Sequence, residues 1–236
     1  MAKTPESRSY RIAVASQHAL VSQSVRTALV DRSFDAVAVR WPGGVPLPRN
    51  PRESGRYDAA LLLGEFERAA RLRAATLLVS HVAAPWVVLT DSPRGPLWGA
   101  MYAVGAHLVL AATTSLDEVA EVLVRVAEGG AGAPEAERLP LIEAWDRLRE
   151  ERELLAARLA TLTPREREVL VLLHAGETAA EIAAVLDVSL STVRSQIKAI
   201  LRKLEVSSQL AAVAAYGTAL DLRQPAANGG GHQAGS

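Results

Sequence analysis

Short apolar runs alternate with longer segments of helical period over the first half of the chain. Runs that are apolar at nearly every position are typical of strands in a parallel sheet covered on both faces. We predict strands at Arg11–Ala15, Ala36–Arg40, Asp58–Leu63, Trp86–Thr90 and His107–Leu110, and helices at His18–Val30 and Leu116–Glu128. The alternation predicts an α/β fold class, with a doubly wound parallel sheet.

Proline and glycine interrupt this pattern between Arg40 and Tyr57. The segment contains Pro42, Pro46, Pro48, Pro51, Gly43, Gly44 and Gly55. Because proline breaks a helix interior, we predict an irregular loop where a crossover helix would normally lie. The glycine-rich run Gly129–Pro134 then ends the first domain.

A charged, helix-favouring linker follows at Leu139–Leu162. Its spaced apolar residues are Leu141, Trp145, Leu148, Leu155, Leu159 and Leu162, and Arg152 completes alternating steps of three and four. This spacing is typical of a short coiled-coil seam with one polar position. An amphipathic helix packed on its own domain gives the same pattern, and both interpretations stay open because about three heptads is the minimum for a coiled coil.

Three further helices are predicted after the linker. Thr163 and Pro164 form a helix start followed by acidic residues, as the helix dipole favours. This helix ends near Gly176, a second begins near Thr178, and a turn at 187–189 leads into a third at about 191–204. An all-α helix-turn-helix arrangement follows from this order.

The third of these helices is apolar on one face and cationic on the other. Its predicted buried stripe is Val193, Ile197, Ile200, Leu201 and Leu204. Its cations are Arg194, Lys198, Arg202 and Lys203, with no acidic residue between Ser191 and Leu204. Since an α-helix fits the major groove, the pattern predicts double-stranded DNA as partner. A merely solvated basic face is the alternative, and the preceding short helix and turn disfavour it.

Composition narrows the classes of function. Lys+Arg and Asp+Glu each number 26, so any DNA affinity must come from a local patch. The absence of cysteine excludes disulfides, thiolate metal sites and cysteine nucleophiles. No nucleotide-binding glycine fingerprint, nucleophile elbow or histidine cluster is present, so we expect no enzyme, no cofactor and no metal. The polar start and short apolar stretches predict a cytoplasmic protein with no membrane span.

The C-terminal pattern resembles the LuxR/NarL-type helix-turn-helix. The resemblance is carried by Leu162-Thr163-Pro164-Arg165-Glu166-Arg167-Glu168-Val169-Leu170, Glu181-Ile182-Ala183 and Ser191-Thr192-Val193-Arg194, with Ile197, Leu201, Lys203 and Leu204. It implies a four-helix domain whose third helix enters the major groove. It further implies base contacts from Arg194, Ser195 and Lys198, and phosphate contacts from Thr192 and Lys203; Arg202 lies on the same cationic helix.

The resemblance also implies a fourth helix at about 208–222 that forms a homodimer surface. Its central residues are Leu210, Val213 and Ala214. Glu205 departs from the family, which usually has a glycine after the recognition helix. Because a left-handed backbone disfavours residues other than glycine, we expect a different cap here.

The first domain resembles a response-regulator receiver, through Ile12-Ala13-Val14-Ala15, the following Ser16-Gln17-His18-Ala19-Leu20-Val21 and Gly105-Ala106. A receiver takes phosphate on an aspartate with the help of Mg²⁺, which needs carboxylate ligands. The corresponding positions hold Ser16 and Gln17 for the two acids, Leu63 for the acceptor and Ala112 for the lysine; the switch hydroxyl Thr90 is retained. The chain is thus similar to an atypical response regulator with a degenerate pseudo-receiver.

Two questions about control stay open. A displaced acid, Glu65 or Asp91, is the alternative route to a conventional phosphorylated regulator. Otherwise a small-molecule or protein effector acts at the receiver-like domain, or the former site is plain packing, which its apolar replacements favour. His18 and His107 lie near strand ends but have no partner ligands, so ordinary surface roles are expected.

The predicted organisation is therefore a receiver-like domain at 1–132, a linker helix at 133–160, the helix-turn-helix domain at 161–223 and a disordered tail at 224–236. The abundance of Ala, Arg, Val and Leu is typical of a GC-rich bacterial genome.

Overall fold

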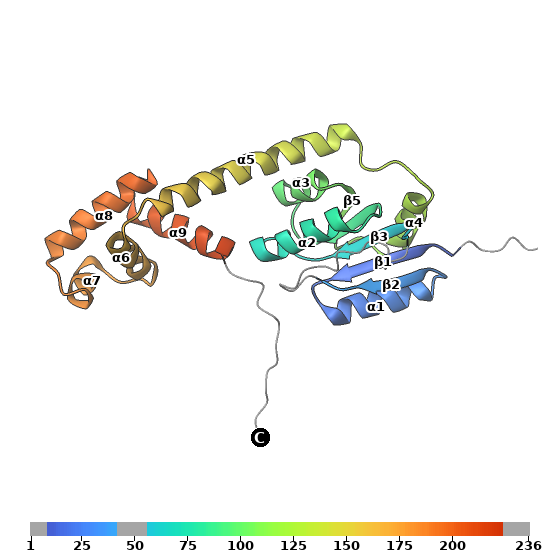
Figure 1. Ribbon diagram of the computed structural model, residues 1–236, viewed down its shortest axis with the longest axis horizontal. Helices are drawn as coiled ribbons and strands as arrows, with labels where there is room; N and C mark the ends of the chain where they lie inside the picture. The colour runs from blue at the N-terminus through green and yellow to red at the C-terminus, as the bar shows by residue number, and fades with distance from the viewer. Residues whose placement is uncertain (1–8, 42–55, 224–236) are drawn as a thin grey trace, which may run out of the picture. The chain divides into compact units, whose positions relative to one another are not determined.

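The computed structural model describes residues 9–41 and 56–223 (Figure 1). Positions 42–55 of the predicted loop, the predicted tail at 224–236 and residues 1–8 of the polar start lie outside the described residues. The described chain forms two compact units, one ending at Asp146 and the other beginning at Arg147. The division falls inside a single helix, α5 (Glu135–Ala160).

The N-terminal unit is built on a five-stranded parallel sheet of order β2-β1-β3-β4-β5. Its strands are β1 (Arg11–Ser16), β2 (Asp35–Val39), β3 (Ala59–Leu63), β4 (Trp86–Thr90) and β5 (Ala106–Ala111). Its helices are α1 (Ala19–Val30), α2 (Ala69–His81), α3 (Pro96–Ala103) and α4 (Leu116–Ala127). This strand order is that of the flavodoxin-like doubly wound fold, so the predicted fold class is confirmed.

Helices cover both faces of the sheet because the central strands are apolar at nearly every position. Alternate residues of β1 point to opposite faces: Val14 joins the core beneath α1 and α4, whereas Ala13 joins the core beneath α2 and α3 (Figure 1). All of β3 is buried as well. The carboxyl ends of β1, β3 and β4 are thereby brought to one edge of the sheet, where doubly wound folds place their sites.

Helix α5 contributes to both units through different residues. Leu141, Ile142 and Trp145 pack on the core of the N-terminal unit, and Leu155 and Leu159 pack in the core of the C-terminal unit. Most of the apolar residues predicted to form a coiled-coil seam are therefore packed in the two cores of the chain itself. This packing supports the interpretation of the linker as an amphipathic helix over that of a coiled coil.

The C-terminal unit is all-helical. After the end of α5 it contains α6 (Pro164–His174), α7 (Ala179–Val185), α8 (Leu190–Leu204) and α9 (Gln209–Arg223). Thr163 caps α6 as predicted, and Thr178 caps α7; both form reciprocal capping boxes with a glutamate three residues later. Among the described residues, no helix combines the length and apolar character that a membrane crossing requires.

The start of α5 packs so closely on α3 that only glycine fits at position 99. A Cβ at Gly99 would lie 1.9 Å from the carbonyl oxygen of Leu141. Gly99→Ala should therefore lower the free energy of unfolding of the N-terminal unit by about 1 to 3 kcal/mol, the usual cost of overpacking. Thermal denaturation checks this, with Gly95→Ala as the control, since a Cβ there meets only the Pro93 carbonyl oxygen at 3.8 Å. Equal melting temperatures for the two variants would contradict the close packing.

Candidate nucleic-acid interface

Local hydrogen bonds fix where α8 begins. Asp187 takes a left-handed conformation (φ 51°) in the turn after α7, a conformation that aspartate tolerates better than most residues. The Ser189 hydroxyl then accepts a hydrogen bond from the Thr192 amide at 3.1 Å. It also lies 2.8 Å from the Thr192 hydroxyl. Thr192 is exposed in this first turn, where backbone amides favour an anion.

The period of α8 separates an apolar face from a cationic face. The buried face consists of Val193, Ile197, Ile200 and Leu204. Arg194, Lys198 and Arg202 recur every four residues and are all exposed, as is Ser195. Eight residues of helix rise about 12 Å, which is close to the major-groove width of about 12 Å.

These three cations are available to a ligand. In residues 9–41 and 56–223, no acidic side chain forms an ion pair with Arg194, Lys198 or Arg202. The face therefore carries a net positive charge on a unit whose other cations are largely balanced. An exposed stripe of this kind attracts phosphates and base-edge acceptors.

Lys203 differs from the other cations of α8. It is half-buried, and its ammonium donates to the Glu166 carboxylate at 2.6 Å and to the Thr161 carbonyl oxygen at 3.1 Å. Its charge is therefore engaged inside the unit, between α8 and the start of α6. The geometry gives Lys203 a structural role that the sequence pattern did not predict.

Glu166 is the buried partner in this pair. Burial alone raises the pKa of its carboxyl, but hydrogen bonds from Lys203 and from Thr163 outweigh that effect, and the pKa lies below its ordinary value. One carboxylate thus caps α6 and holds the last turn of α8. It joins α6 to the end of α8.

Glu205 ends α8 in the left-handed conformation, with φ 56° and ψ 42°. The expectation of a different cap is therefore wrong: the glycine-type geometry is kept without the glycine. The Glu205 carboxylate forms an ion pair with Arg158 of α5. The same guanidinium lies 3.5 Å from the Leu204 carbonyl oxygen.

The predicted dimer residues lie on α9. Leu210 is 79% exposed and Ala214 is also exposed, whereas Val213 is half-buried. The opposite side of α9 buries Ala212 and Ala219 in the core of the unit. A large apolar side chain such as Leu210 is thus left in solvent beside small residues.

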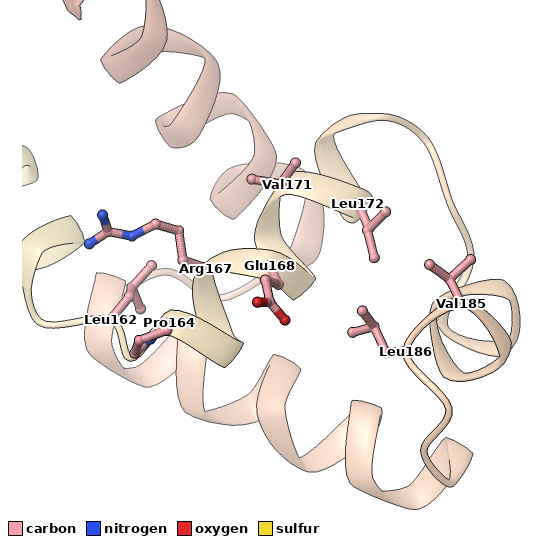
Figure 2. A pocket seen from close by; sticks show the side chains of 8 residues that line it. All are labelled: Leu162, Pro164, Arg167, Glu168, Val171, Leu172, Val185 and Leu186. Carbon is pink, nitrogen blue, oxygen red and sulfur yellow. The ribbon is translucent and has the colours of Figure 1, made fainter.

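An apolar groove lies elsewhere in the same unit, between α6 and α7. Figure 2 shows Leu172, Val185 and Leu186 facing one another across it. The full lining is Leu162, Pro164, Arg167, Glu168, Val171, Leu172, Val185 and Leu186. None of the residues predicted to contact DNA lines this groove.

The residues predicted to line a degenerate receiver pocket lie at the carboxyl edge of the sheet. Ser16 pairs in register with Leu63, and Thr90 with Ala111, next to the exposed Ala112. The Ser16 hydroxyl accepts from the His18 amide at 3.2 Å. The Thr90 hydroxyl accepts from the Ser92 amide at 3.1 Å. The two hydroxyls at this edge serve the local backbone.

The remaining predicted positions carry no acid into this edge. Leu63 is buried in the core beneath α1 and α4, and the Gln17 amide nitrogen lies 3.2 Å from the His18 ring. Glu65 forms an ion pair with Arg71 of α2, while Asp91 is exposed. Within the described ranges, no group of three or more His, Cys, Asp or Glu side chains is arranged to hold a metal ion.

The C-terminal unit is similar to a known family. Residues 160–215 match the family described as "Bacterial regulatory proteins, luxR family". The nitrate/nitrite response regulator protein NarP of Escherichia coli (strain K12) is 28% identical over 215 residues, which cover 88% of this chain and 94% of NarP.

Solved structures of two response regulators also match. The RcsB–DNA complex is 19% identical, with a TM-score of 0.38, over 89% of this chain and 99% of that one. ChrA, from a heme-sensing two-component system, is 21% identical, with a TM-score of 0.40, over 90% and 98%.

Residues 160–215 of the helix-turn-helix unit are thus similar to the luxR family of bacterial regulatory proteins, and the chain as a whole is similar to the response regulator NarP.

The Glu166–Lys203 pair makes the stability of the chain depend on pH. A carboxyl whose pKa is lowered by folding stabilises the protein above its unfolded pKa of about 4.3, and this contribution is lost as the pH falls through the lower folded pKa. Glu166→Gln should lower the free energy of unfolding at pH 7 by about 1 to 3 kcal/mol, because it weakens a charge-assisted hydrogen bond. It should also reduce the loss of stability between pH 5 and pH 3, measured by urea denaturation.

Glu168→Gln is the matched control, since it changes an exposed acid of the same helix whose pair with Arg165 lies in solvent. Its effect at pH 7 should stay below about 1 kcal/mol. An unchanged acid sensitivity in Glu166→Gln would show that the buried pair does not stabilise the fold.

Proposed function

We propose that the protein is a sequence-specific DNA-binding regulator of transcription that reads the major groove with α8. Arg194, Ser195 and Lys198 contact base edges, and Thr192 and Arg202 contact the phosphate backbone. The observation that carries this proposal is the exposed, unpaired cationic face of α8, opposite its buried stripe, in a luxR-family domain. Lys203 is left out of this surface because its ammonium is bound to Glu166.

The DNA-bound form is proposed to be a homodimer. One recognition helix reads too few base pairs for a genomic site, and paired half-sites supply the rest. The exposed Leu210, with Val213 and Ala214 on the same helix, supports α9 as the surface where two copies meet.

Arg194→Ala tests the reading of bases. It should weaken binding to a selected DNA site by about 1 to 3 kcal/mol and relax the preference at one base position, because a bidentate base contact is lost. Mobility-shift titration with the selected site and its single-base variants measures both effects. Arg68→Ala, which removes an exposed arginine from the other unit, is the control and should bind like the parent. Parent-like affinity and preference in Arg194→Ala would refute the assignment.

Arg202→Ala tests the phosphate contact separately. It should weaken binding to all DNA sequences to a similar extent and reduce the slope of log affinity against log salt by about 1, since one fewer counterion is released. Titrations at several salt concentrations measure the slope. A loss confined to the selected site, with an unchanged slope, would contradict the proposed phosphate contact.

We further propose that the receiver-like unit works without phosphorylation. The positions proposed to correspond to the Mg²⁺-binding acids hold Ser16 and Gln17. The position proposed for the phosphate acceptor holds Leu63, which packs in the core. The alternative acceptors have less support, since Glu65 is paired with Arg71, and among the described residues Asp91 belongs to no group of three or more His, Cys, Asp or Glu side chains that could hold a metal. Control then rests on an effector molecule, on a partner protein or on the amount of regulator present.

Phosphorylation is directly testable. Incubation with labelled acetyl phosphate and Mg²⁺ should leave at least about a hundredfold less label on this chain than on a phosphorylatable receiver. The reason is that the metal ligands and the acceptor, whose contacts stabilise the transition state by several kcal/mol, are missing. Stable label that disappears in Glu65→Gln or Asp91→Asn would overturn the proposal in favour of a displaced acid.

A further inference from the structure

The end of the recognition helix is held in a conformation that its own residue disfavours. Glu205 is left-handed, a region in which glycine carries no steric penalty and other residues do. A glycine would satisfy this cap by its backbone alone. The Glu205 side chain forms an ion pair with Arg158, which offsets the steric cost of the left-handed backbone.

Arg158 joins two parts of the cap at once. One terminal nitrogen of its guanidinium pairs with the Glu205 carboxylate, and the other lies 3.5 Å from the Leu204 carbonyl oxygen. A cation at this point is favoured by the negative end of the α8 dipole. The planar guanidinium suits this double contact better than an ammonium would.

The contact reaches α8 from the last turns of α5. Leu159, the neighbour of Arg158, is buried in the core of the unit, and the carbonyl oxygen of Thr161 accepts from Lys203. Arg158 is 28% exposed on its side chain and Glu205 65%, so neither belongs to the buried stripe. By the period of α8, Glu205 lies close to the side of the helix that carries Arg194 and Arg202, and its carboxylate there is paired with Arg158. The last turns of α5 and α8 are thus joined by these polar contacts beside the proposed DNA-reading face.

We infer that Arg158 and Glu205 form a clasp by which the linker helix positions the recognition helix, so that specific DNA affinity depends on the state of the end of α5. The inference rests on the proposed DNA-binding function. Arg158 and Glu205 act as positioning residues and are not expected to touch DNA. The ion pair also neutralises the Glu205 carboxylate, which lies three residues from Arg202 and would otherwise repel a phosphate bound there.

The test separates stability from DNA reading in the full chain. Glu205→Gly should keep or raise the melting temperature, because glycine relieves the left-handed strain, and yet weaken binding to the selected site about threefold to tenfold. Arg158→Met should weaken that binding to a similar extent, while Arg158→Lys should retain most of the affinity. The double variant Arg158→Met, Glu205→Gly should bind no more weakly than either single variant, as expected for residues that act as one unit.

Arg147→Met is the matched control, since it removes an exposed arginine from the same helix. Affinity for the selected site is measured beside affinity for a scrambled sequence, and the ratio of the two should fall only when the clasp is broken. Variants of Arg158 and Glu205 that bind both DNAs as the parent does, with only the melting temperature changed, would overturn the clasp alone. A parent chain that prefers no sequence would overturn the proposed function together with the clasp.

Discussion

Burial of one face of α8 is the constraint on which the DNA-reading geometry depends. Val193, Ile197, Ile200 and Leu204 fill the centre of a core formed with α6, α7 and α9. Each fully buried aliphatic side chain contributes about 1.5 to 3 kcal/mol, so this stripe fixes the rotation of the helix about its axis. Once that rotation is fixed, Arg194, Lys198 and Arg202 must point to solvent. The polar contacts of Glu166 and Arg158 then hold the far end of the same helix.

In the N-terminal unit, the fold does not depend on acidic side chains at the carboxyl edge of the sheet. The sheet is maintained by apolar strands and two helical layers. Ser16, Leu63 and Thr90 still lie together at the carboxyl edge because strand register places them there. Their chemistry is that of packing and backbone hydrogen bonds. If the unit works without phosphorylation, as we propose, it transmits an input through a ligand, a partner or its own stability.

Helices and strands with a clear repeat of apolar residues could be predicted from the sequence, whereas elements that depend on tertiary contacts could not. The five strands and the capped helix starts follow from apolar runs and from Thr163 and Thr178. Helices α2 and α3 were not predicted individually. The sequence of α2 is rich in alanine, leucine and arginine, so it did carry a helical signal. By contrast, α3 is short, begins at Pro96 and has Gly99 inside it, so its helical propensity is low.

The candidate site shows the same division. The exposed cations at steps of four could be predicted from the sequence. The helical period could also have separated Lys203 from them, because Lys203 lies about 100° around the helix from Arg202 and therefore off the cationic face. Its partner Glu166 lies 37 residues earlier, so the pair itself required the fold. The Arg158–Glu205 pair was likewise invisible, because no local pattern links a linker residue to a helix cap.

The central claim is that a cationic recognition helix reads DNA under a receiver-shaped unit that has no phosphate switch. The most direct measurement is the affinity of the full chain for a site selected from random DNA, with and without Mg²⁺ and beryllofluoride, a mimic of the phosphoryl group on an acidic side chain. We expect tight, salt-dependent and sequence-selective binding that is the same in both conditions. A change in affinity of tenfold or more, which corresponds to about 1.4 kcal/mol of coupling, would show that the receiver-like unit still responds to phosphorylation.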